Sequence, residues 1–146
     1  MSFDREAVIT RCVELKRDVV AEDEFDTGQR MKLNLGHTIG HGVEALSNFQ
    51  ISHGKAVAIG MAIVTRAANA LGICDENTCR HVIEILQKFG LPTSCAYDAD
   101  CLFHCALSDK KRSGGTVNLI IPERIGFCRI APTPVGDIQS FIEAGL

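Results

Sequence analysis

Three histidines are the residues of this chain whose type and spacing best suit chemistry. His37 and His41 lie four residues apart in the segment GHTIGH (residues 36–41), and His53 opens the segment HGK. On a helix, this spacing places His37 and His41 on one face, one turn apart. Three imidazoles brought together form a candidate divalent-metal site, with zinc as the leading metal. By spacing alone all three are candidate ligands, and a purely structural role is the alternative. Glu44 follows His41 by three residues, where it could orient that imidazole or simply be solvated.

Positively charged side chains and an amide lie near the histidines in the sequence. Arg30 and Asn34, in the segment RMKLN, could hold an anionic substrate beside a metal. By themselves, Lys16 and Arg30 would most often be surface charges. Lys110 and Lys111 belong to a charged run that usually forms a solvated turn, and the two glycines nearby support that interpretation.

The elements that must position these residues are mostly helices. Apolar residues recur at helical spacing, and a β-rich segment follows near the C-terminus. We expect helices over residues 4–20, 31–46, 53–71, 75–89, 98–107 and 134–144, and an antiparallel pair of strands over 116–121 and 125–130. The helix that begins at His53 is apolar almost all round, which predicts a central, buried position. Gly36, Gly40 and Gly42 each cost about 1 kcal/mol in a helix relative to Ala, which indicates close backbone contact or a ligand there.

Composition bounds the class of protein. The chain has 146 residues, of which 46% are hydrophobic and 23% are charged, so we expect one globular domain. A net charge of -3 argues against nucleic-acid binding. The seven scattered cysteines predict reduced, mostly buried thiols in a cytoplasmic protein. The longest apolar stretch is too short to cross a membrane.

Two joined motifs resemble the C-terminal helical domain of the 3-dehydroquinate synthase family. They are RMKLNLGHTIGHGVE at residues 30–44 and HGKAVAIGM at residues 53–61. Shorter matches are KRDVVAEDE at 16–24, DKK at 109–111 and PERIG at 122–126. The likeness runs over almost the whole chain.

The resemblance implies a fold and a missing partner. It implies that residues 1–146 form a mainly α domain of the dehydroquinate synthase-like type, with a small antiparallel β-pair near the C-terminus. Enzymes of this family also have an N-terminal domain that binds NAD. This chain has no glycine-rich dinucleotide fingerprint, so we expect a fragment or a separately expressed domain that is inactive alone and prone to form a homo-oligomer.

The resemblance also divides the roles among the candidate residues. It implies that His37 and His53 are ligands of a catalytic Zn²⁺ or Co²⁺, whose third ligand is a glutamate of the N-terminal domain. His41 would contact substrate and help to move protons. The residues that resemble the family's substrate- and phosphate-binding set are Lys16, Arg30, Asn34 and one of Lys110 and Lys111. Lys55 departs from the family, which commonly has Glu there.

The reaction that the resemblance implies is a lyase step of the shikimate pathway, in aromatic amino acid and chorismate biosynthesis. It converts 3-deoxy-D-arabino-heptulosonate 7-phosphate to 3-dehydroquinate and phosphate, with NAD in the complete enzyme. The alternatives are another sugar-phosphate cyclase, a polyol dehydrogenase of the same superfamily, or a non-catalytic module that binds a partner.

Overall fold

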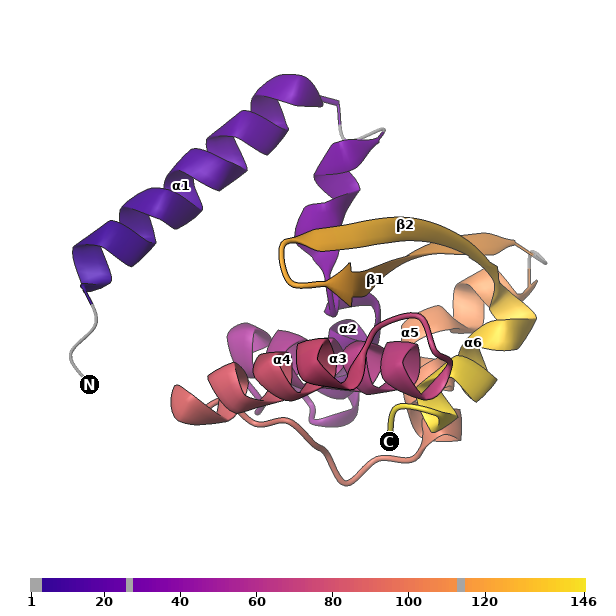
Figure 1. Cartoon of the computed structure of the whole chain (residues 1–146). Helices are drawn as coiled ribbons and strands as arrows, with labels where there is room; N and C mark the ends of the chain where they lie inside the picture. Colours follow the sequence, from indigo (N-terminus) through magenta and orange to yellow (C-terminus); the bar gives the residue numbers. More distant parts are fainter. Residues whose placement is uncertain (1–3, 26–27, 113–114) are drawn as a thin grey trace. The chain divides into compact units, whose positions relative to one another are not determined.

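The computed structural model describes residues 4–25, 28–112 and 115–146, and the chain divides into two compact units (Figure 1). The first unit is Met1–Leu33 and the second is Asn34–Leu146. All three histidines of the GHTIGH and HGK segments belong to the second unit.

The first unit consists of helix α1 (Arg5–Glu22) and most of the short 3-10 helix η1 (Gln29–Asn34). Asp4 caps α1, because its carboxylate accepts a hydrogen bond from the backbone N–H of Ala7 at 3.0 Å. None of the residues of α1 is buried.

The second unit is built around helix α3 (His53–Ala70), which carries ten buried residues. The helices α2 (His37–Leu46), α4 (Glu76–Lys88) and α6 (Val135–Glu143) and strand β1 (Thr116–Arg124) all contact it. The central, buried position predicted for this helix is therefore confirmed. Because α3 is apolar on most sides, it can be covered by helices and by the hairpin at the same time.

The single helix predicted over residues 31–46 is wrong, because the chain breaks it at Gly36. This glycine has a φ of 79°, in the left-handed region that favours glycine, and it separates η1 from α2. A Cβ at Gly36 would lie 2.5 Å from the backbone N of Met61, and a Cβ at Gly60 would collide with the carbonyl O of Gly36. The close backbone contact that the glycines of this segment predicted is confirmed: Gly36 and Gly40 lie against α3, whereas Gly42 lies against the backbone at Leu102.

Two aspartates begin the next helices, as the sequence predicted. The Asp75 carboxylate accepts from the N–H of Thr78 at 2.6 Å and caps α4. The Asp98 carboxylate accepts from the N–H of Cys101 at 2.8 Å, at the start of α5 (Ala99–Arg112). These hydrogen bonds hold the pKa of both carboxyls below the ordinary value. Helix α5 runs beyond residue 107, where we expected its end.

The predicted antiparallel pair is present and longer than expected. Strand β1 (Thr116–Arg124) pairs with β2 (Phe127–Pro134), with Ile120 opposite Ile130. Pro122 does not end the first strand. In a two-stranded sheet its nitrogen can face away from the partner, where no ladder hydrogen bond is lost.

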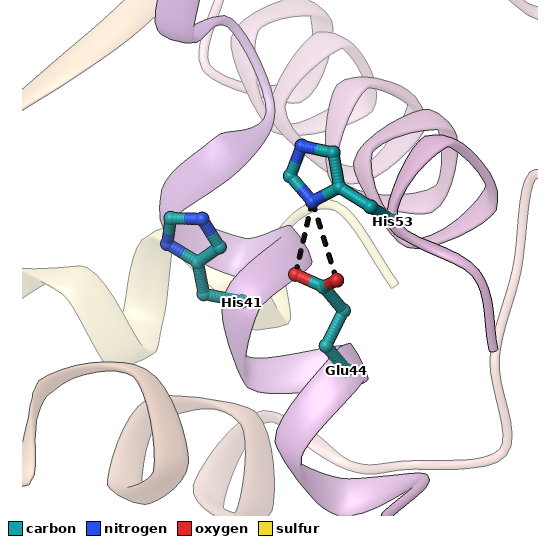
Figure 2. A group of neighbouring side chains, drawn as sticks. All are labelled: His41, Glu44 and His53. Carbon is teal, nitrogen blue, oxygen red and sulfur yellow. Dashed lines mark hydrogen bonds and ion pairs between the residues drawn. The ribbon is translucent and has the colours of Figure 1, made fainter. Parts of the chain in front are cut away.

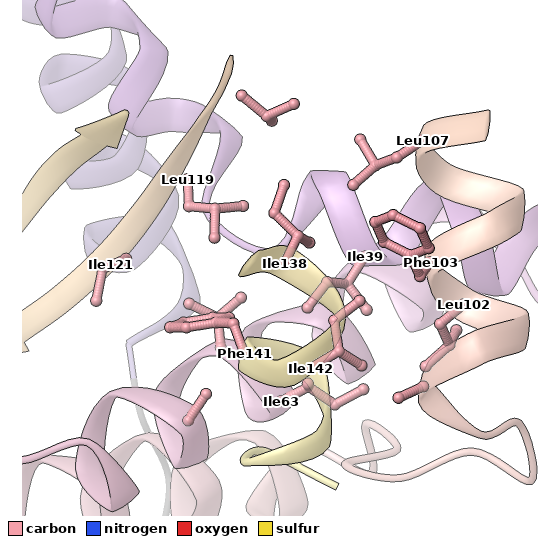
Figure 3. Close-up of a cluster of buried hydrophobic side chains, with 14 of the residues drawn as sticks. Ile39, Ile63, Leu102, Phe103, Leu107, Leu119, Ile121, Ile138, Phe141 and Ile142 are labelled. Carbon is pink, nitrogen blue, oxygen red and sulfur yellow. The ribbon is translucent and has the colours of Figure 1, made fainter. Parts of the chain in front are cut away.

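The core of the second unit is aliphatic with two phenylalanines. It joins α2, α3, α5, β1 and α6, and its members include Ile39, Ile63, Leu102, Phe103, Leu119, Ile138, Phe141 and Ile142 (Figure 3). The cysteines contribute less than predicted. Cys74 is buried, but Cys12, Cys101 and Cys105 are exposed, so the expectation of mostly buried thiols is wrong. Among the described residues, no helix is long and apolar enough to cross a membrane.

Candidate metal centre

The structure brings the three predicted histidines together on the second unit. The ring centroids of His37 and His53 are 5.2 Å apart, those of His37 and His41 are 5.8 Å apart, and those of His41 and His53 are 6.0 Å apart. The helical spacing placed the first two on one face of α2, and the first residue of α3 adds the third. The three imidazoles form a triangle that is open to solvent, since His41 and His53 are exposed.

The face of α2 opposite the histidines holds this helix in the core. A short loop after α2 then brings the start of α3 beside it. Ile39 and Val43 are fully buried in the core, so the side of α2 that carries the histidines faces outward. The Ser47 hydroxyl donates to the carbonyl O of Glu44 at 2.9 Å and accepts from the N–H of Ile51 at 3.2 Å. These hydrogen bonds order the loop that delivers the start of α3 beside α2.

Glu44 contacts His53 rather than His41. The Nδ1 atom of His53 lies 3.1 Å and 3.2 Å from the two carboxylate oxygens of Glu44 (Figure 2). The Glu44 side chain is 14% exposed, against 57% for His53. The sequence suggests His41 as the partner of Glu44, because the two residues lie three positions apart on the same helix. Sequence spacing alone gave no signal that a residue of the next helix would be the partner.

The ring nitrogens of the other two histidines have different surroundings. The Nδ1 atom of His37 lies 3.4 Å from the carbonyl O of Leu35, a long contact. Within the described part of the chain, no hydrogen-bond acceptor contacts the ring of His41. His37 and His53 therefore each have Nδ1 near an oxygen acceptor, which leaves Nε2 as the nitrogen that could bind a metal.

The donor atoms present fit a divalent metal such as zinc. One nitrogen each of His41 and His53 and one carboxylate oxygen of Glu44 lie within 4.8 Å of one another. Imidazole nitrogens and carboxylate oxygens are both ordinary zinc ligands. Two ligand sets are thus compatible with the geometry. One uses His37 and His53, with Glu44 behind His53, and the other uses His41, Glu44 and His53 directly.

A cavity of about 640 Å³ lies between the start of α3 and the segment that follows α4. Ile51, Lys55, Leu91 and Tyr97 are among the residues that line it, and the three histidines are not. Lys55 is exposed and borders this cavity.

The other predicted site residues are divided between the two units. Lys16 is exposed on α1, and the Arg30 guanidinium donates through Nη1 to the carbonyl O of Glu24 at 2.8 Å, both within the first unit. Asn34 is exposed at the end of η1. Lys110 and Lys111 fall in the last turn of α5, and their side chains lie outside the described residues.

Comparison with known proteins adds to this geometry. A family model described as 3-dehydroquinate synthase C-terminal matches residues 2–112. A 3-dehydroquinate synthase from Enterococcus faecalis is 39% identical over 139 residues, and one from Streptococcus suis is 40% identical over 138 residues. These matches cover 94% and 93% of this chain but 39% of each relative, so the chain spans about two fifths of the length of its curated relatives.

Solved structures of cyclases share the fold. A 2-deoxy-scyllo-inosose synthase, complexed with carbaglucose-6-phosphate, NAD⁺ and Co²⁺, superposes with a TM-score of 0.80 at 26% identity. The match covers 97% of this chain and 41% of that one. A 2-epi-5-epi-valiolone synthase from Streptomyces hygroscopicus, with NAD⁺ and Zn²⁺ bound, gives a TM-score of 0.80 at 22% identity, over 95% of this chain and 38% of that one, and shows the fold alone.

Proposed function

This chain belongs to the family of 3-dehydroquinate synthase C-terminal domains, and from that premise we propose that it forms the metal- and substrate-binding part of a 3-dehydroquinate synthase. The reaction would be the conversion of 3-deoxy-D-arabino-heptulosonate 7-phosphate to 3-dehydroquinate and phosphate, in the cytoplasm. The observation that carries the proposal is the triangle of His37, His41 and His53, with ring centroids 5.2–6.0 Å apart, inside the family's motif.

We assign His37 and His53 as the metal ligands. Ligand histidines usually donate their second ring N–H to a carboxylate or a backbone carbonyl, and these two have such an acceptor at Nδ1. A bound Zn²⁺ or Co²⁺ would polarise the substrate's hydroxyl or carbonyl oxygen. The third protein ligand and the NAD site would come from the dinucleotide-binding half that this family possesses.

The remaining site residues would bind and orient the substrate. His41, one turn from His37 and exposed, is placed to exchange a proton or a hydrogen bond with substrate beside the metal. Arg30, Lys16 and a lysine of the 110–111 pair would hold phosphate and carboxylate groups by charge-assisted hydrogen bonds. Asn34 can bond a hydroxyl without adding charge.

A second candidate is a different sugar-phosphate cyclase. The superposition on 2-deoxy-scyllo-inosose synthase favours it, because that protein carries a hexose-phosphate analogue, NAD⁺ and Co²⁺ on the same fold. A polyol dehydrogenase and a non-catalytic binding module are less well supported, since neither explains the arginine and lysines of the family motifs.

The test is an assay of phosphate release by this chain joined to, or mixed with, a dinucleotide-binding half from a relative. We expect NAD- and zinc-dependent release from the heptulosonate phosphate and none from hexose phosphates. Release from a hexose phosphate alone would establish the second candidate. A chain that binds no divalent metal in either setting would contradict both.

A further inference from the structure

We propose that Glu44 is a positioning residue that fixes the orientation and tautomer of His53, so that the Nε2 atom of His53 faces the metal. This inference rests on the proposed function for the presence of the metal. The contact itself is independent of that function, because it lies within the second unit and joins α2 to the first residue of α3.

The chemistry of the contact determines which nitrogen carries the proton. Both carboxylate oxygens of Glu44 lie within 3.2 Å of one ring nitrogen, the Nδ1 of His53. An ionised carboxylate can only accept hydrogen bonds, so this nitrogen is the donor. A neutral imidazole has one N–H, and therefore Nε2 keeps a lone pair that is available to a metal.

The burial of the two side chains determines which of them, Glu44 or His53, restrains the other. Glu44 is 14% exposed and lies on a helix whose buried residues Ile39 and Val43 anchor it in the core. His53 is 57% exposed at the first position of its helix, and its ring also lies beside the rings of His37 and His41. The carboxylate is thus the fixed member of the pair, and it restrains a side chain that would otherwise sample several rotamers before binding a metal.

Direct ligation by Glu44 would change this contact. If Glu44 bound the metal itself, one carboxylate oxygen would turn from Nδ1 to the ion, and at most the other oxygen would remain as the acceptor of His53. A positioning role keeps both contacts in place while Nε2 binds. This is the arrangement in which a carboxylate, a histidine and a metal lie in series.

Four variants of the 146-residue chain test the proposal: Glu44→Ala, Glu44→Gln and the matched controls Glu84→Ala and Glu84→Gln. Glu84 is an exposed glutamate of α4 whose described partner is Arg80. The first measurement is the tautomer of His53 in the metal-free chain, from ¹⁵N NMR of the imidazole at a pH where the ring is neutral. The second is Co²⁺ affinity and the absorption spectrum at saturation, with circular dichroism as the check on folding.

We expect Glu44→Ala to lose the Nδ1–H preference of His53 and to weaken Co²⁺ binding by about 10–100-fold, the usual effect of removing such a partner. Glu44→Gln should retain the tautomer, because its amide oxygen still accepts, and should lose less affinity. Both should give the wild-type Co²⁺ spectrum at saturation, and the Glu84 controls should behave as the wild type.

Two results would overturn the inference. One is an unchanged His53 tautomer together with unchanged affinity in Glu44→Ala. The other is a changed Co²⁺ spectrum in both Glu44 variants, which would make Glu44 a ligand. Absence of Co²⁺ binding by the wild-type chain would instead count against the proposed metal centre. The tautomer measurement would still decide the role of Glu44.

Discussion

His37 and His41 stand one turn apart on α2, yet we expect their replacement to have different effects. His37→Ala and His53→Ala should abolish Zn²⁺ binding and, in an assembly with the NAD-binding half, abolish turnover as well. His41→Ala should keep most of the metal and lower turnover by about 10²–10⁴-fold, the range of a general acid–base contribution. Metal analysis beside steady-state kinetics on the three variants measures both effects.

The result that would reverse this assignment is loss of zinc in His41→Ala as complete as in His37→Ala. The ligands would then include His41, and the alternative set of His41, Glu44 and His53 would be favoured. His104→Ala is a suitable control, because this histidine lies on α5 and its described ion-pair partner is Asp100.

For individual residues, the sequence predicted which histidines lie close together. It did not predict which atom each ring nitrogen contacts. The four-residue spacing and the family motif were enough to bring His37, His41 and His53 together. The contact of Glu44 with His53 depends on how the loop after α2 returns, and no periodicity encodes that. The roles of Lys16, Arg30, Asn34, Lys110 and Lys111 stay predictions.

Between elements, the packing of α2 against α3 depends on glycine. A Cβ at Gly60 would collide with the carbonyl O of Gly36 and come within 2.9 Å of the N of Gly40. We expect Gly60→Ala to lower the free energy of unfolding by about 1–3 kcal/mol, because backbone atoms of α2 must move to admit the methyl group. Urea denaturation measures the loss.

Gly136→Ala is the matched control for this change. Gly136 also lies in a helix, α6, but a Cβ there would meet nothing within 4 Å. The free energy of unfolding of the Gly136→Ala variant should stay unchanged or rise by less than about 1 kcal/mol, because Ala has the better helix propensity. Equal destabilisation by both changes would show that the contact between α2 and α3 is not the cause.

The cap of α4 leads to a prediction about how stability depends on pH. Hydrogen bonds from Thr78 hold the pKa of Asp75 below its ordinary value of 3.8. A lowered folded-state pKa means that the stabilisation is complete above the ordinary value and is lost as the pH falls through the lowered one. Asp75→Asn can still cap but cannot titrate. We therefore expect wild-type stability to fall relative to this variant between pH 3.8 and the lowered pKa, in urea titrations at stepped pH. A constant difference across that range would contradict the assignment.

Helices and strands were predicted well in type and less well at their ends. Asp75, Asp98 and the apolar run after His53 gave correct starts, because capping and burial are local signals. The break at Gly36 was missed, because apolar periodicity continues through it. The fit of α3 against that glycine is a tertiary contact, which a single segment does not reveal.

For the whole chain, we expect no turnover by the purified 146 residues. The chain spans about two fifths of the length of its curated relatives, and under the proposed function the NAD site and the third zinc ligand would lie in the remainder, whereas a catalytic zinc site needs three protein ligands with an open position. Steady-state assays with NAD, Zn²⁺ and the heptulosonate phosphate measure this. Turnover above that of the His53→Ala variant would contradict it.

Helix α1 leads us to expect self-association. Ile9 and Val13 are each 63% exposed and lie four residues apart on a helix without buried residues. Most of the stability of a helix in a protein comes from packing of an apolar face, so apolar contact with a second chain would stabilise α1. Sedimentation velocity should show concentration-dependent oligomers.

The double change Ile9→Lys with Val13→Lys should weaken this association, whereas Ile85→Lys on α4 should leave it unchanged. A monomer at all concentrations for the wild type would rule the interface out. An equal effect of all three lysines would point to general repulsion rather than to α1.

Helix α2 has two independent faces, one inside the core through Ile39 and Val43 and one outside with His37 and His41. In the described part of the chain the candidate ligands lie outside the core cluster, so under the proposed function we expect that folding does not depend on the ion as that of a zinc finger does. The metal-stripped protein should retain its helical circular dichroism. If the proposed function holds, substitutions on the outer face of α2 would change metal or substrate binding and leave the packing of Ile39 and Val43, and with it the fold, intact.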